Sequence, residues 1–403
     1  MTGDTVRKIV HLDLDAFFCA VEELRDPSLR GKPFAVGGSP TGRGVVTSAS
    51  YAARKYGVRS AMPMARAVRL CPGLIRVSSK FSNYTSKSKE VKRIMRDFTD
   101  LVQPISIDEA FLDFSEFDES GEFFARKLQN RIMEDVHLPC SLGVATNKLV
   151  AKIATNVGKA AHHTNTYPNA IQVVPPGEEA AFLAPLPSEA LWGVGPKTAK
   201  KLTRLEINTI GDIAARPANE LRQQLGKVGL DLSRRAKGID KRPISMGREA
   251  KSVSHESTFR KDVNDRQKLE EVILRHSKSI SKRLRRAKLA GITVKVKLRW
   301  SDFTTISRQT TLEVPTNDED TIYQAAVKVF KKHWPDRKPV RLIGVGVSGM
   351  TPPSRQLSLW DVPIIERESR LQAAVDDLRE RYGSQSIRLG RTIIDNADRE
   401  QTV

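Results

Sequence analysis

The sequence predicts an α+β fold divided into several domains, and three observations support this prediction. The chain has 403 residues, whereas a single hydrophobic core stops growing at roughly 250 to 300 residues. Strand and helix patterns alternate through the N-terminal part, around a set of acidic residues. A proline-rich run, VVPPGEEAAFLAPLP, ends this part of the chain. The stretch after it is predicted to be helical and is poor in strand formers.

The first predicted element is a strand that runs directly into a helix. Residues 9–14 alternate between two faces, with His11 and Asp13 on the same face as Ile9, and the apolar period becomes helical over residues 17–24. Asp13 falls at the junction, where a strand end and a helix N-terminus leave side chains facing open space. Asp15 stands where it could cap the helix.

The elements that follow continue the alternation. Residues 31–70 are predicted to hold two short strands, FAVGG and VVTSAS, a glycine-rich turn and the basic helix YAARKYG. An amphipathic helix near residues 91–100 leads to a strand pair, LVQPISIDEAFLDF, and to a helix over residues 123–136. A strand, a turn and a helix that carries Lys148, Lys152 and Lys159 are then predicted in CSLGVATNKLVAKIATNVGK.

The C-terminal half has a different organisation. After the proline-rich run the chain is predicted to be helical, and a polar linker leads to another α/β unit. In GITVKVKLRW one face of a strand is apolar and the other carries Lys295, Lys297 and Arg299, so that the second face is a basic stripe. A proline-flanked peptide and a short amphipathic helix close the chain, the helix with Leu371, Val375, Leu378 and Tyr382 on its apolar face.

The charge of the chain predicts a polyanionic partner. Lys and Arg number 67 against 47 Asp and Glu, which leaves a formal net charge of +20; nucleic acid is the leading candidate, and an anionic membrane surface is the second. No stretch approaches the roughly 20 apolar residues of a membrane span, and the N-terminus has acidic residues where a signal peptide would be apolar. We therefore expect a soluble, cytoplasmic protein without a membrane partner.

The cysteines and histidines do not predict a metal or redox site. Cys19, Cys71 and Cys140 are isolated and lack the paired spacing of zinc or redox motifs, so they are interpreted as small buried hydrophobic residues. The pair His162–His163 has no third ligand close in the sequence. No role is assigned to the histidines.

Two adjacent carboxylates, Asp108 and Glu109, lie inside the apolar run ISIDEAFLDF. Carboxylates lose hydration in such surroundings, so positive charge is expected nearby. If this strand lies beside the first one, Asp13 joins them, and three oxygen donors favour magnesium or manganese over zinc. In a regular strand Asp108 and Glu109 would point to opposite faces, so both can bind a metal only at a bend or a hairpin tip. From the residues alone, carboxylates paired to Lys or Arg are an equally good interpretation.

Five segments of the chain, in this order and separation, resemble the Y-family translesion DNA polymerases of the DNA polymerase IV type. They are HLDLDAFFCAVEE, SYAARKYGVRSAMP, SIDEAFLD, CSLGVATNKLVAKIAT and LWGVGPKTAKKL. The resemblance implies a right-hand polymerase. Its expected parts are a palm at residues 1–15 and 81–171, fingers at 16–80, a thumb with a helix-hairpin-helix at 172–243, a linker at 244–254, an α/β little finger at 255–350 and a tail at 351–403.

The resemblance also implies the residues of a catalytic site. Asp13, Asp108 and Glu109, with the Leu14 carbonyl, are expected to bind two Mg²⁺ ions, with Mn²⁺ as the alternative. A second set is expected to contact the incoming deoxynucleoside triphosphate, with Phe18 as the ring that rejects a ribose 2′-hydroxyl: Phe18, Ser48, Tyr51, Arg54 and Lys159. From periodicity alone, Phe17 and Phe18 would both be core residues and the basic side chains an ordinary helix face.

Contacts to macromolecules are implied in the same way. Gly193 and Gly195 match a helix-hairpin-helix whose backbone amides approach a DNA phosphate, and Lys295, Lys297 and Arg299 are expected to contact DNA phosphates without sequence specificity. The peptide QLSLW resembles the segment by which bacterial polymerases bind the sliding clamp, through Gln356, Leu357, Leu359 and Trp360. Its alternative is docking of the tail on its own protein.

The expected activity is template-directed addition of deoxynucleotides to a primer by a monomer, with low fidelity and a role in DNA damage tolerance, repair and replication. Two rival readings are a catalytically silent scaffold that binds DNA and the clamp, and a metal-dependent nucleotide cyclase. The chain departs from the family pattern after Lys159, where KAAHHTNTYPNAIQVV replaces a short proline-glycine turn.

Overall fold

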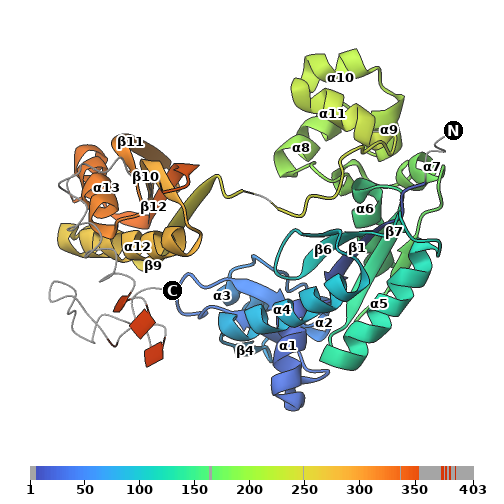
Figure 1. Cartoon of the computed structure of the whole chain (residues 1–403), viewed down its shortest axis with the longest axis horizontal. Coiled ribbons are helices and arrows are strands. Elements are labelled where there is room, and N and C mark those ends of the chain that lie inside the picture. The colour runs from blue at the N-terminus through green and yellow to red at the C-terminus, as the bar shows by residue number, and fades with distance from the viewer. Residues whose placement is uncertain are drawn as a thin grey trace. The chain divides into compact units, whose positions relative to one another are not determined.

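The computed structural model describes residues 6–162, 166–247, 249–335 and 337–353, together with residues 374, 375, 377, 378, 381, 382 and 386 (Figure 1). The chain divides into two compact units near residue 249.

A five-stranded sheet organises the N-terminal unit, with the strand order β5-β6-β1-β7-β8. Its strands are β1 (Ile9–Leu14), β5 (Val102–Pro104), β6 (Glu109–Asp113), β7 (Cys140–Ala145) and β8 (Ile171–Val173). β1 pairs antiparallel with both β6 and β7 and therefore lies in the middle of the sheet.

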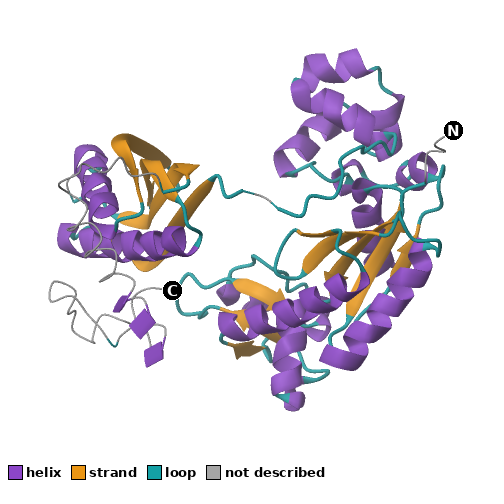
Figure 2. Cartoon of the chain, in the orientation of Figure 1, coloured by secondary structure: helices purple, strands orange, loops and turns teal. Residues whose placement is uncertain are grey.

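Helices cover both faces of this sheet, as the alternation in β1 requires (Figure 2). They are α4 (Phe81–Phe98), α5 (Gly121–Val136) and α6 (Lys148–Ala161). Val10, Leu12 and Leu14 share a core with α4 and α5, whereas Ile9 shares a core with α6. Gly143 of β7 permits the close packing of α6, since a Cβ at this position would lie 2.0 Å from the Ala151 carbonyl oxygen.

A second, three-stranded sheet with the order β3-β2-β4 lies between β1 and α4 in the sequence. Its elements and the helices around it are α1 (Phe17–Arg25), η1 (Pro27–Leu29), β2 (Phe34–Gly37), β3 (Val46–Ala49), α2 (Tyr51–Lys55), α3 (Met64–Leu70) and β4 (Ile75–Val77). The sequence predicts β2, β3 and α2 but not β4. This strand has only three residues, none of them buried, so no alternating pattern marks it.

The segment after β8 is helical, as its sequence predicts. It consists of α7 (Glu179–Leu183), η2 (Ser188–Ala190), α8 (Pro196–Arg204), α9 (Ile210–Ala215), α10 (Ala218–Leu225) and α11 (Lys227–Ala236). Thr209 and Asp212 form a capping box that starts α9. Buried residues of these helices, among them Leu202 and Ile213, continue the core that α6 forms with the sheet.

The C-terminal unit is a four-stranded antiparallel sheet with the order β11-β10-β12-β9 and two helices. Its elements are β9 (Ser252–Val263), α12 (Arg266–Arg286), β10 (Ala290–Trp300), β11 (Thr305–Thr316), α13 (Glu319–His333) and β12 (Val340–Thr351). β9 begins slightly before residue 255, so strand structure enters the expected linker. Val294, Val296 and Leu298 are buried in a core with α12 and α13, which confirms the predicted alternation of β10.

The cysteine prediction is confirmed, since Cys19, Cys71 and Cys140 are free and buried. Among the described residues, no helix is both long and apolar enough to cross a membrane. The residues of the expected clamp-binding peptide, Gln356, Leu357, Leu359 and Trp360, lie outside the described residues. Val375, Leu378 and Tyr382 are in helical conformation, in agreement with the predicted helix.

Candidate active site

The register between β1 and β6 brings the predicted carboxylates together. Asp13 lies directly opposite Glu109 across the antiparallel pair, so both side chains emerge on the face that α6 crosses. Asp108 precedes β6, and its carbonyl oxygen accepts a hydrogen bond from the Leu14 amide at 2.9 Å. The two distant segments therefore meet at one end of β1.

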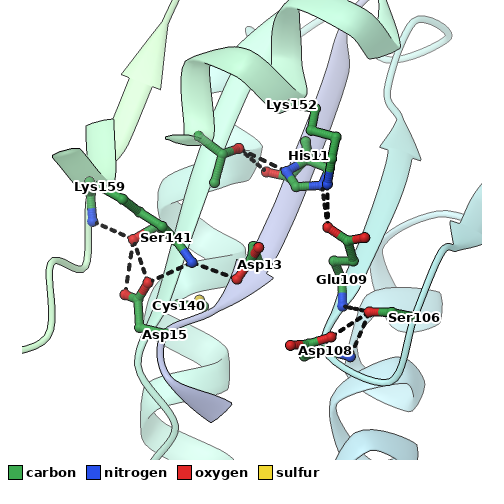
Figure 3. A network of polar contacts seen from close by, with 12 residues as sticks. His11, Asp13, Asp15, Ser106, Asp108, Glu109, Cys140, Ser141, Lys152 and Lys159 are labelled. Atoms are coloured by element: carbon green, nitrogen blue, oxygen red, sulfur yellow. Dashed lines mark hydrogen bonds and ion pairs between the residues drawn. The ribbon is translucent and has the colours of Figure 1, made fainter. Parts of the chain in front are cut away.

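Asp108 lies in the turn between β5 and β6, which supplies the predicted bend. Ser106 stabilises this turn, because its Oγ accepts hydrogen bonds from the amides of Asp108 (3.2 Å) and Glu109 (3.1 Å). The Ser106 hydroxyl in turn donates to the Asp108 carboxylate (Figure 3). Asp108 and Glu109 are thus not consecutive residues of a regular strand.

Helix α6 places basic side chains over these carboxylates. Lys152 forms an ion pair with Glu109, and Lys159 forms ion pairs with Asp13 and, at 2.9 Å, with Asp15 (Figure 3). The expectation of nearby positive charge is therefore confirmed. Their spacing along the helix puts both lysines on the face that packs on the sheet.

Glu109 has a second neighbour in His11, which is fully buried. The His11 Nε2 lies 3.4 Å from Glu109 Oε2, and its Nδ1 lies 2.8 Å from the Thr155 hydroxyl of α6. Burial acts to raise the pKa of Glu109, but the contact with His11 and the hydrogen bond and charge of Lys152 outweigh it and lower the pKa to about 2. Glu109 is therefore ionised throughout the physiological range.

The interpretation of Asp15 as a helix cap is wrong. The N-cap of α1 is Ala16, whose φ of 42° turns the chain into the helix one residue later, and α1 has no side-chain cap. The Asp15 carboxylate instead accepts hydrogen bonds from the Ser141 hydroxyl (2.9 and 3.0 Å) and from the Asn169 amide (3.1 Å). Asp15 is fully buried and holds the Lys159 ammonium through an ion pair.

The pKa values of Lys159 and Asp13 are both raised, for different reasons. Burial acts to lower the pKa of Lys159, but the charges of Asp13 and Asp15 and the bonds to them raise the pKa above its ordinary value. Burial raises the pKa of Asp13, and Lys159 opposes this shift. In the free protein, therefore, the lysines neutralise the carboxylates.

The donor set fits a hard divalent cation, because Asp13, Asp108, Glu109 and the Leu14 carbonyl are all oxygen ligands at one end of two paired strands. No group of three acidic, His or Cys side chains within the described ranges is gathered closely enough to hold a metal ion as it stands. Lys152 pairs with Glu109 instead, and Lys159 pairs with Asp13. The assignment of Asp13, Asp108, Glu109 and the Leu14 carbonyl as metal ligands remains a prediction.

The predicted nucleotide contacts lie on α1, β3, α2 and, for Lys159, α6. Phe17 is buried, as expected, while Phe18 is half-buried with its ring centroid 4.3 Å from that of Tyr84. The Arg54 guanidinium lies 4.5 Å from the centre of the Tyr51 ring. Ser48 is buried, and its Oγ lies 3.5 Å from the Cys19 sulfur. Ser48 is therefore less accessible to a phosphate than the other predicted residues.

The predicted DNA contacts lie in the turn before α8 and on β10. Gly193 has a φ of 107°, a backbone conformation that residues with a Cβ rarely adopt, so this position favours glycine. Gly195 is the N-cap of α8 and has open space beside it. On β10, Lys295 is exposed and Lys297 pairs with Glu256 at 2.9 Å. The Arg299 Nε donates to the Thr305 hydroxyl at 2.8 Å.

Comparison with known proteins agrees with the geometry. Residues 12–156 match the impB/mucB/samB family, and residues 250–359 match the C-terminal domain of that family. A protein named DNA polymerase IV from Dehalococcoides mccartyi (strain CBDB1) is 39% identical over 392 residues, which cover 96% of this chain and 98% of that protein. The chain belongs to the impB/mucB/samB family.

Other relatives of this impB/mucB/samB family member have the same name or fold. A DNA polymerase IV from Listeria monocytogenes serotype 4a (strain HCC23) is 40% identical over 87% of this chain and 97% of its own length. A solved Y-family DNA polymerase chimera is 27% identical, with a TM-score of 0.74 over 86% of this chain and all of that chain. The solved DinB from Sulfolobus solfataricus is 28% identical, with a TM-score of 0.59 over 85% of this chain and 98% of that chain. The resemblance to Y-family polymerases and the right-hand polymerase fold are therefore confirmed.

Sequence reasoning missed several residues of the site in this family member. The sequence patterns assign no part in the site to His11, Asp15 or Thr155, and they place Lys152 only on a helix. A signal existed for two of them, because His11 shares a strand face with Asp13 and Lys152 shares a helix face with Lys159. Nothing in the local pattern marks Asp15, whose partners come from three distant segments.

Proposed function

We propose that this protein is a template-directed DNA polymerase of the low-fidelity translesion type, which adds deoxynucleotides to a primer 3′ end and releases pyrophosphate. The observation that carries the proposal is the β1–β6 register, which sets Asp13 opposite Glu109 with Asp108 in the adjoining turn, in a chain of the impB/mucB/samB family. We assign the sheet with α4, α5 and α6 to the palm and the three-stranded sheet to the fingers. The helices after β8 are assigned to the thumb, and the C-terminal sheet to the little finger.

Asp13, Asp108, Glu109 and the Leu14 carbonyl would hold two Mg²⁺ ions, with Mn²⁺ as the alternative. When bound, these ions lower the pKa of the primer 3′-hydroxyl and neutralise the triphosphate and the departing pyrophosphate. Lys152 and Lys159 would have to release Glu109 and Asp13 for these carboxylates to bind a metal. Lys159 is long and mobile enough to exchange Asp13 for a phosphate oxygen.

Tyr51, Arg54 and Lys159 would hold the triphosphate by a hydroxyl, a guanidinium and an ammonium. Phosphoryl transfer needs mainly positioning and charge neutralisation, and these groups supply both without covalent chemistry. Phe18 would lie against the deoxyribose and exclude a 2′-hydroxyl. Its contact with Tyr84 supports this role, because it restricts the movement of the ring.

DNA would be bound through its phosphates. Gly193 and Gly195 would present backbone amides at the start of α8, and the stripe of Lys295, Lys297 and Arg299 would contact the duplex electrostatically. Both contacts are independent of base sequence, as a polymerase requires. We also propose that the monomeric protein acts in the cytoplasm and binds a sliding clamp through Gln356, Leu357, Leu359 and Trp360.

Primer extension tests the proposed function. The labelled primer is extended with Mg²⁺ and each deoxynucleotide separately, by the parent and by Asp108→Ala. We expect correct single additions by the parent and a loss of more than about 100-fold in Asp108→Ala, because a ligand that acts in the transition state is removed. DNA affinity should stay within about twofold, since phosphate contacts elsewhere supply it.

The matched control is Asp118→Ala, which removes an exposed carboxylate in the turn after β6 and should extend like the parent. Extension retained in Asp108→Ala would refute the site assignment. If the parent binds DNA tightly but does not extend the primer, the protein is instead a catalytically silent scaffold that binds DNA and the clamp.

A further inference from the structure

The segment that follows α6, which departs from the family pattern, ends against the nucleotide-binding side of the palm. The Asn169 amide donates to Asp15 at 3.1 Å, and the Ala170 amide donates to the Ser141 hydroxyl at 3.1 Å. The Gln129 side chain donates to the Asn169 carbonyl at 3.1 Å. Asp15 also binds Lys159, so this segment is tied to a carboxylate that positions a predicted triphosphate contact.

Tyr167 of the same segment contacts a second predicted triphosphate residue, Tyr51. The two ring centroids are 5.5 Å apart with an interplanar angle of 75°, an edge-to-face pair. Tyr51 also has the Arg54 guanidinium 4.5 Å from its ring centre. In the part of the chain that the structure describes, Tyr167 is the one aromatic ring recorded in contact with Tyr51.

The space around this pair explains why the contact matters. Tyr51 and Tyr167 both line a cavity of about 340 Å³, whose other walls include Ala20, Leu24 and Met133. A ring that borders open space can change its side-chain rotamer unless a neighbour restrains it. Without Tyr167 the cavity would be larger, and the Tyr51 ring would gain room to turn away from the triphosphate.

We infer that Tyr167 is a positioning residue, which holds Tyr51 in the orientation that binds the incoming triphosphate. The inference rests on the proposed function of Tyr51 and assigns a role to a segment that the proposed function leaves unexplained. The two rings meet edge to face, so the aromatic ring of Tyr167 carries the proposed role. Burial, together with the nearby charge of Glu23, raises the pKa of Tyr167 and keeps its hydroxyl protonated.

The test compares Tyr167→Ala with Tyr167→Phe. With a dideoxy-terminated primer no bond forms, so the Kd of the correct deoxynucleotide in the ternary complex is measured directly. We expect Tyr167→Ala to raise this Kd, and the KM for the deoxynucleotide, about two- to tenfold. This ratio corresponds to the interaction free energy of one aromatic pair. The maximal rate and the DNA affinity should stay within about twofold, because neither depends on this pair. Tyr167→Phe keeps the ring and should restore the parent Kd.

A double-mutant cycle shows whether Tyr167 acts through Tyr51. Adding Tyr167→Ala to Tyr51→Ala should have no further effect on the Kd, because the positioned ring is already absent. Tyr56→Ala, which removes an exposed tyrosine at the end of α2, is the control and should behave as the parent. An unchanged Kd in Tyr167→Ala, or a further loss in the double variant, would overturn the inference.

Failure of the proposed function is distinguishable in the same experiment. If the parent neither extends a primer nor retains the correct deoxynucleotide, the proposed function itself is refuted. If the parent does both and Tyr167→Ala matches it, only the inference about Tyr167 is refuted.

Discussion

Replacing Lys159 by Met should destabilise the free protein through the carboxylates it leaves behind. Asp15 is fully buried and lies 2.9 Å from the Lys159 ammonium, and removal of one partner of a buried ion pair costs about 3–5 kcal/mol. Two features reduce this cost here: Asp15 keeps its bonds to Ser141 and Asn169, and the Asp13 side chain is 24% exposed. We therefore expect Lys159→Met to lower the free energy of unfolding by about 2–3 kcal/mol at pH 7.

The pH dependence of this loss follows from the pKa of Asp13, which burial already raises. Without Lys159 it rises further, so the folded state takes up a proton more readily than the unfolded state as the pH falls. The destabilisation should therefore shrink between pH 7 and pH 5. Mg²⁺ should recover part of it, because a bound cation stabilises only the folded state.

Hydrogen exchange of peptides that cover β1 and α6, measured over a range of urea concentrations, reports this free energy locally. Lys55→Met, which removes an exposed lysine of α2, is the control and should change it by less than about 0.5 kcal/mol. A loss below that limit for Lys159→Met, or a loss that grows as the pH falls, would refute the reasoning.

Three further predictions concern other parts of the chain. Phe18→Leu should increase incorporation of ribonucleotides relative to deoxynucleotides about tenfold or more, measured in single-nucleotide additions. An unchanged ratio would show that Phe18 does not reject the ribose 2′-hydroxyl. Gly143→Ala should cost about 1–3 kcal/mol because α6 must move. Gly73→Ala, with open space around it, is its neutral control in thermal unfolding. Burial lowers the pKa of His276 to about 3, aided by His255, so the unfolded state binds more protons below pH 6.5. The C-terminal unit should then lose about 2 kcal/mol between pH 7 and pH 5, and urea unfolding of His276→Leu should show a flatter pH profile.

Local patterns were sufficient for most elements of the fold. In β10 the strict alternation assigned Val294 and Leu298 to the core and Lys295 to the opposite face, because side chains of a strand alternate between two sides. The same argument required a bend at Asp108, and the turn before β6 provides it. The sequence does not predict the short strand β4, because three residues, none of them buried, are too few to show an alternating apolar pattern.

The sequence by itself determined the chemistry of the site: acidic residues within apolar strands, basic residues on the following helix, and positive charge near Asp108 and Glu109. Only the tertiary structure decided which groups meet. The register of β1 against β6 pairs Asp13 with Glu109, and the packing of α6 on Gly143 brings Lys159 to Asp15. A local period states which face of an element a side chain occupies, but not which distant element covers that face. Contacts between segments far apart in the chain, such as Tyr167 with Tyr51, follow from packing of the whole unit.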